Sequence, residues 1–127
     1  MEVKEKLKKY SDAEHCPVRN VISHFSSKWS ILLLHILAEE SPMRFGEISR
    51  VLEDISPKVL TSTLKNLESV GLVCRKVYAE VPPRVEYSLT PSGRTLIPAL
   101  APLVQWSIDN FASIVGNRGT ALSFKLK

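Results

Sequence analysis

The sequence has few of the residues on which metal, cofactor and nucleophilic chemistry usually depend. Its two cysteines, Cys16 and Cys74, lie far apart and form neither a CxxC motif nor a mixed cysteine–histidine pattern, so neither a zinc site nor a disulfide framework is indicated. There is no glycine-rich phosphate loop, no paired-carboxylate motif and no Ser/His/Asp set around the three histidines. We therefore expect no catalytic residue, no metal and no cofactor, and the chain is not predicted to be an enzyme.

Long apolar runs are also missing. The longest is ILLL, from Ile31 to Leu34, whereas a membrane-spanning helix needs about 20 apolar residues. The first ten residues, MEVKEKLKKY, are basic but lead into a polar segment, which does not fit a secretory signal. We expect a cytoplasmic protein that does not bind membranes, with both cysteines as free thiols. The length of 127 residues predicts one domain, 1–127.

The charge balance favours an acidic partner only weakly. Seventeen lysines and arginines against thirteen acids give a net charge of +4 and a pI of about 9.2. Such a balance suits a polyanion such as nucleic acid, but many basic proteins bind nothing acidic. The position of the charges therefore matters more than their sum.

The hydrophobic pattern predicts a mostly helical α+β fold. Apolar residues at helical spacing indicate helices that end in a long C-terminal one, and β-branched and aromatic residues indicate two strands before it. Prolines 98 and 102 predict a kink or break in that last helix. We expect a frayed, charged lead-in at 1–14, helices at 17–25, 28–38, 45–53 and 57–70, strands at 72–78 and 85–90, a helix at 91–115 and a tail at 116–127. This order is typical of a winged helix-turn-helix with a two-stranded wing.

The predicted helix that begins at Pro57, with Ser56 as its N-cap and Gly71 at its end, has an unusual polar face. On a helical wheel, one side is apolar and the other lacks acids, with Glu68 at the flank. The polar side carries Lys58, Thr61, Ser62, Lys65 and Ser69. A solvated face usually mixes both charge signs, whereas lysines and small hydroxyls suit a DNA groove. A solvated polar face, and a winged fold that binds protein instead of DNA, remain the alternatives.

The predicted wing strengthens the DNA interpretation. The stretch between Ile55 and Arg94 contains six basic and three acidic residues, so its local net charge is +3. Arg84 falls in the proline-containing hairpin tip AEVPPR, from which a wing reaches the DNA backbone or minor groove.

Several separated motifs together resemble one family. They are CPV at Cys16, KW before an apolar helix, RF at the third helix, IS-x-K-x-LT, LE-x-x-GL and Y-x-LT-x-x-G. The stretch from about Cys16 to Trp106 is similar to the HxlR-type winged helix-turn-helix transcription regulators, relatives of the MarR group. Ser27 and Asp54 stand where that family often has glycine. The resemblance implies a homodimer on double-stranded DNA, with Ser56, Lys58, Thr61, Ser62 and Lys65 in the groove and Arg84 on the wing.

The C-terminal helix has more apolar residues than a small core absorbs, which predicts a two-fold dimer. We expect the long helix and the N-terminal segment to form its interface, with two groove helices spaced for a palindromic operator. The predicted interface residues are Val18, Leu103, Trp106 and Phe111.

Cys16 is the candidate reactive residue. It precedes Pro17, the expected first residue of a helix, where the helix dipole favours a thiolate, with Arg19 supporting and Glu14 opposing it. The alternative is a small buried hydrophobic residue, the fate expected for Cys74. The resemblance adds that several HxlR-type regulators sense oxidants, quinones or aldehydes through a cysteine at the CPV position. A small electrophile or oxidant is therefore the predicted effector.

Overall fold

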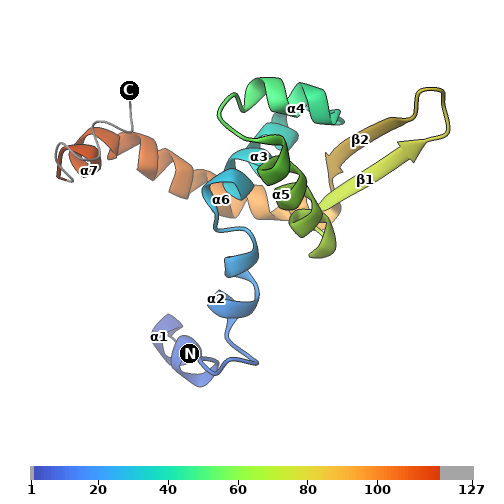
Figure 1. Cartoon of the computed structure of the whole chain (residues 1–127). Helices are drawn as coiled ribbons and strands as arrows, with labels where there is room; N and C mark the ends of the chain where they lie inside the picture. The colour runs from blue at the N-terminus through green and yellow to red at the C-terminus, as the bar shows by residue number, and fades with distance from the viewer. Residues whose placement is uncertain (1, 118–127) are drawn as a thin grey trace.

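The computed structural model describes residues 2–117, which form a chain of helices interrupted by one antiparallel ribbon (Figure 1). The order of elements matches a winged helix-turn-helix followed by a long helix, as predicted. The elements are α1 Val3–Lys9, α2 Pro17–Asn20, the 3₁₀ turn η1 Ile22–His24, α3 Lys28–Glu39, α4 Phe45–Val51, α5 Pro57–Ser69, β1 Val73–Tyr78, β2 Arg84–Leu89, α6 Pro91–Asp109 and α7 Phe111–Asn117.

Local capping explains where α5 begins and ends. The hydroxyl oxygen of Ser56 accepts a 3.1 Å hydrogen bond from the Val59 amide at the start of α5, and Pro57 occupies the first helical position. At the other end, Gly71 has a φ of 80°, and its amide and that of the next residue bond to the carbonyls of Glu68 and Leu67. This is a Schellman ending, which needs glycine in the left-handed region. Both ends of α5 are therefore set by the local sequence.

The core lies where α3, α4, α5, the ribbon and α6 meet, at the centre of Figure 1. Its fully buried side chains are aliphatic and come from helices and from the first ribbon residue: Leu33, Leu34, Leu37, Ile48, Leu60, Leu64, Leu67 and Val73. The ribbon projects from one side of this core, while α1 and α7 lie away from it. The core thus holds α5 against the base of the ribbon.

The ribbon pairs β1 with β2 from Val73↔Leu89 to Tyr78↔Arg84. Because side chains alternate along a strand, Arg75 and Tyr87 share one face. A single bridge adds Met43 to the outer edge, with main-chain bonds of 2.9 and 2.8 Å to Tyr87. This bridge fixes the base of the wing to the turn before α4.

The N-terminal region differs from the sequence-based expectation. Residues 1–14 were expected to form a frayed, charged lead-in, whereas the structure has the helix α1 within them. The helix predicted at 17–25 is also shorter: α2 stops at Asn20, and η1 follows as a 3₁₀ turn. The side chain of Asn20 bonds to the carbonyl oxygens of Ala13 and Cys16, which draws the loop before α2 over the helix.

The long helix also ends differently. A kink or a break was expected at Pro98 or Pro102; a break there is wrong, because α6 continues through both to Asp109, and a kink stays a prediction. The chain instead breaks at Asn110, whose backbone and side-chain nitrogens both bond to the carbonyl oxygen of Trp106 at 3.0 and 2.9 Å. Side-chain bonds of this kind compete with helix propagation. Of the predicted tail, residues 118–127 lie outside the described part of the chain.

Within residues 2–117, no single helix is long and apolar enough to cross a membrane. The segments Pro17–His24 and Lys28–Glu39 reach the required length only as a pair, which is bent by 60°.

Candidate nucleic-acid interface

The polar face of α5 lies on the surface of the molecule, as its sequence predicts. The side chains of Lys58, Thr61, Ser62, Lys65 and Ser69 are exposed, whereas Leu60, Thr63, Leu64 and Leu67 face the core. The edges of the apolar face are less buried than expected, because Val59 and Val70 are exposed. An exposed helix with one continuous polar face is therefore available to a large partner.

Hydroxyl groups on this face are partly satisfied inside the helix. Ser62 donates a 3.0 Å bond to the carbonyl oxygen of Val59, and Ser69 donates a 2.7 Å bond to that of Asn66. Each hydroxyl oxygen keeps lone pairs that can accept from a base edge. Short side chains of this kind let a helix approach the floor of a groove closely.

The two lysines of this face have no ion-pair partner within the described chain. Neither Lys58 nor Lys65 forms an ion pair with any of residues 2–117; the pairs found there are Asp12–His15 and those of Arg84. Glu68 is the one acid of α5 and lies at the flank. The face therefore presents uncompensated positive charge to solvent, which favours a polyanion.

A hollow of about 420 Å³ lies between α5 and the ribbon. Its lining comes from one side of α5 and from one face of the ribbon: Thr61, Leu64, Lys65, Glu68, Arg75 and Tyr87. Arg75 was counted among the basic residues of the region but was not singled out from the sequence. The strand alternation places it on the α5 side, which only the observed register reveals.

Arg84 was expected at the hairpin tip, but the structure does not place it there. It is the first residue of β2 and pairs with Tyr78. Its guanidinium lies 3.9 Å from the centre of the Tyr78 ring, 3.3 Å from a Glu80 oxygen and 3.7 Å from a Glu86 oxygen. The last distance is too long for a hydrogen bond, and Nε has no hydrogen-bond partner among the described residues. Arg84 is thus held inside the wing.

The two cysteines differ in burial, and Cys74 is not buried as its place in a strand predicted. Cys16 is buried, with 8% of its surface exposed, and Cys74 is exposed. The expectation that Cys74 is buried is wrong, because it lies on the ribbon face opposite the buried Val73. Cys16 is the N-cap of α2, and its carbonyl oxygen accepts bonds from the backbone and side chain of Asn20, both at 2.9 Å.

The residues predicted for a dimer interface are all exposed in the single chain. Between 47% and 55% of the surface of each is accessible for Val18, Leu103, Trp106 and Phe111. In Figure 1, the second half of α6 and α7 extend away from the core, as does the N-terminal segment. These apolar side chains are therefore free to meet a second surface.

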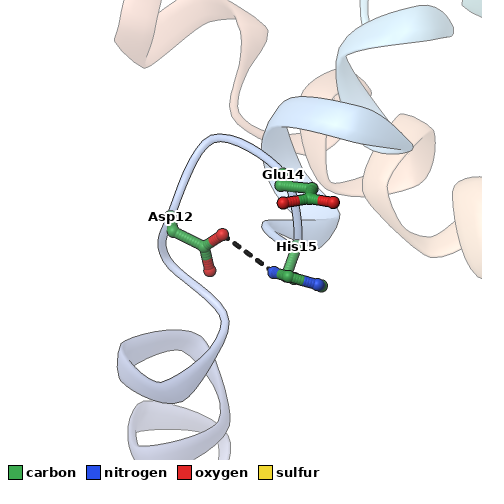
Figure 2. Close-up of side chains that lie close together, drawn as sticks. All are labelled: Asp12, Glu14 and His15. Carbon is green, nitrogen blue, oxygen red and sulfur yellow. Dashed lines mark hydrogen bonds and ion pairs between the residues drawn. The ribbon is translucent and has the colours of Figure 1, made fainter.

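One small polar cluster lies in the loop before α2. Figure 2 shows Asp12, Glu14 and His15, whose ligand atoms lie within 4.8 Å of one another. All three are exposed, and His15 Nδ1 lies 2.8 Å from the Asp12 carboxylate. The hydrogen bond from His15 lowers the pKa of Asp12 below its ordinary value. A surface carboxylate–imidazole hydrogen bond accounts for this geometry without a metal.

Comparison with known proteins agrees with this geometry. The model of the HxlR-like helix-turn-helix family matches residues 24–114. An HTH-type transcriptional regulator of Halalkalibacterium halodurans is 43% identical over 109 residues, which cover 86% of this chain and 94% of that protein.

Solved structures show the same likeness. The transcriptional regulator ytfH from Salmonella typhimurium has a TM-score of 0.73 at 37% identity, over 85% of this chain and 96% of that one. The redox regulator HypR in its oxidized form has a TM-score of 0.69 at 39% identity, over 75% of this chain and 97% of that one. This protein therefore belongs to the HxlR-like helix-turn-helix family, a family of transcriptional regulators and not of enzymes.

Proposed function

We propose that the protein is a transcriptional regulator that binds a specific sequence in double-stranded DNA. The observation that carries this proposal is the exposed, acid-free face of α5, where Lys58 and Lys65 are unpaired within the described chain and small hydroxyls lie between them. A helix of this kind fits the major groove. Lysines reach phosphates or guanine edges, and the hydroxyls accept or donate at base edges.

Each predicted contact residue has a role in this proposal. Ser56 caps α5 and sits at the end that enters the groove first. Thr61 and Ser62 read base edges, and Lys58 and Lys65 bind phosphate or guanine. Arg84 contributes through the wing, whose shape it maintains by ion pairs with Glu80 and Glu86 and by a cation–π contact with Tyr78.

A DNA-binding measurement tests the proposal. Genomic fragments bound by the protein are selected, and the affinity for the selected sequence is measured against salt. If Lys58 and Lys65 contact phosphates, replacing both with alanine lowers the salt slope by about 2 per subunit. If they contact guanine, operator affinity falls by about 1–3 kcal/mol for each lysine.

The control variant carries alanine at Lys4 and Lys8 of α1, which removes the same charge from a helix that lies away from the wing in Figure 1. Equal effects of the two double variants would mean that only net charge matters. Unchanged operator binding by the Lys58/Lys65 variant would remove α5 from the interface.

We further propose a homodimer on a palindromic operator. The support is the row of exposed apolar side chains on α6 and α7, with Val18 on the N-terminal segment. A two-fold axis there would place two copies of α5 about 34 Å apart, one helical turn of DNA. Light scattering should give twice the chain mass, and Trp106→Glu should shift it toward the monomer. A monomeric wild type at micromolar concentration contradicts the proposal.

Regulation through Cys16 is a separate part of the proposal. Its support is the position of Cys16 as the N-cap of α2 and the likeness to a redox regulator. In this scheme the Cys16 thiolate adds to a ring carbon of a quinone. The C=C π bond breaks, its electron pair moves to the carbonyl oxygen, which takes a proton from water, and loss of the ring proton leaves the thioether of a hydroquinone. The N-terminal segment then changes its packing. The effector is then a small electrophile or oxidant.

The matched pair of variants is Cys16→Ser and Cys74→Ser, treated with a quinone before operator affinity is measured. We expect wild type and Cys74→Ser to change affinity and Cys16→Ser to remain unchanged. Because Cys74 is the exposed thiol, a response that Cys74→Ser abolishes would assign the switch to the wing instead.

A further inference from the structure

The hollow between α5 and the ribbon adjoins the proposed groove face but draws part of its lining from the wing. At about 420 Å³, it is much larger than the roughly 30 Å³ that one water occupies in the liquid. A tetrahedral oxyanion with several hydrating waters fits such a volume. The hollow is therefore large enough for one phosphate group of a nucleic-acid backbone.

Its lining has the chemistry of an oxyanion site. Lys65 and Arg75 are exposed, and neither forms an ion pair within residues 2–117. Glu68 is the single acid of the lining, so the net charge is +1. The hydroxyls of Thr61 and Tyr87 are additional donors. A guanidinium and an ammonium group that line the same hollow suit a phosphate, which accepts both kinds of charged hydrogen bond.

The other two basic residues of the ribbon do not face this hollow. Lys76 lies beside Glu86 in the strand register, on the opposite face of the ribbon. Its ammonium group lies 4.9 Å from the centre of the Tyr78 ring. Arg84 is held by two glutamates and the same ring. Of the three, Arg75 is the one directed toward α5.

We propose that this hollow binds a DNA backbone phosphate between Arg75 of the wing and Lys65 of α5. The inference rests on the proposed DNA-binding function and adds Arg75 as a contact that fixes the angle between α5 and the duplex. Contacts to phosphate set register and orientation without reading sequence. The negative charge of Glu68 repels the phosphate and lowers the affinity of the site.

Random-sequence duplex DNA is the appropriate probe, because a phosphate contact does not depend on sequence. Binding of the full chain is followed by fluorescence anisotropy between about 50 and about 200 mM salt. Arg75→Ala should lower the salt slope by about 0.9 per subunit. Over this fourfold range, wild-type affinity then falls about 3.5-fold more per subunit than that of the variant. Lys76→Ala should keep the wild-type slope, although it removes the same charge from the next residue.

Two further variants test the charge of the hollow. Arg75→Lys keeps the charge and should keep the slope. Glu68→Gln should raise affinity for the duplex severalfold at low salt, whereas Glu5→Gln on α1, with the same change in net charge, should not. A wild-type slope for Arg75→Ala, or equal slopes for Arg75→Ala and Lys76→Ala, would overturn the phosphate site while DNA binding stands. Absence of wild-type binding to any duplex would instead overturn the proposed function itself.

Discussion

The side-chain amide of Asn66, on α5, donates a 2.7 Å hydrogen bond to the main-chain carbonyl oxygen of His24. This bond joins the helix with the candidate DNA-binding face to the 3₁₀ turn that follows α2, the helix capped by Cys16. Beside it lies a mainly apolar hollow of about 220 Å³, lined by Asn20, Val21, His24, Phe25, Val70 and Leu72. This hydrogen bond therefore ties the N-terminal segment to α5.

We expect Asn66→Ala to lower the free energy of unfolding by about 1 kcal/mol, the usual contribution of one hydrogen bond. Amide exchange at His24 and Phe25 should become faster, because the segment loses its link to α5. Asn66→Asp should behave alike, since a carboxylate cannot donate. Ser69→Ala is the control, because the Ser69 hydroxyl bonds only within α5. If the two alanine variants exchange at the same rate around His24, the bond does not hold this segment.

Gly93 gives a prediction about the junction between α6 and the ribbon. A Cβ atom there would lie 2.3 Å from the carbonyl oxygen of Leu72, which is backbone and cannot rotate away. We expect Gly93→Ala to destabilise the protein by about 1–3 kcal/mol in urea unfolding, as overpacked sites do. Gly46→Ala is the matched control, since a Cβ there meets nothing within 4 Å. Alanine inside helix α4 should instead be neutral or stabilise by up to about 1 kcal/mol.

The features that could be predicted from the sequence depend on neighbouring residues. Ser56, Pro57 and Gly71 fix both ends of α5 through bonds of short sequence separation, and the 3.6-residue period sorts its two faces. The same reasoning located the ribbon and its turn. The candidate groove face was therefore predictable before any tertiary contact was known.

The features that could not be predicted depend on which strands and faces meet. The placement of Arg75 beside α5 follows from the register Arg75↔Tyr87. The exposure of Cys74 follows from which ribbon face the core covers. The one-residue bridge of Met43 to Tyr87 has no periodic pattern at all. The residue pattern within a segment of about ten residues does not show which distant segments will pair with it.

The hydrogen bond between Asp12 and His15 predicts a local pH response (Figure 2). That bond lowers the pKa of Asp12 below its ordinary value of 3.8. A carboxyl group with a lowered pKa in the folded state stabilises the fold above its unfolded pKa, and this contribution is lost as the pH falls through the folded pKa. Because Asp12 is fully exposed, solvent screens this interaction and its contribution to the stability of the fold is small.

An NMR titration of the Asp12 carboxyl checks this. His15→Ala should return the pKa of Asp12 toward 3.8, and Glu14→Gln, which leaves the His15 hydrogen bond in place, should change it less. Equal pKa values of Asp12 in wild type and His15→Ala would show that the hydrogen bond is not formed in solution.

Arg84 is the residue for which the sequence and the structure suggest different routes to the same function. Its place near the hairpin tip predicts a direct contact with DNA, whereas its guanidinium is engaged with Tyr78, Glu80 and Glu86. A surface ion pair contributes about 0.2–1 kcal/mol, and an exposed cation–π contact contributes about 0.5–1 kcal/mol. To reach a phosphate, the side chain would have to give up these contacts.

We therefore expect Arg84→Ala to loosen the wing and to weaken DNA binding without changing its salt dependence. The wing amides from Tyr78 to Arg84 should exchange faster, and the operator should bind less tightly because the wing is no longer held in one shape. The salt slope separates this from direct contact, since loss of a phosphate contact lowers the slope by about 0.9 per subunit. Lys76→Ala, on the same ribbon face, is the control for charge. A slope lowered by Arg84→Ala but not by Lys76→Ala would show that Arg84 leaves its two glutamates and binds the DNA backbone.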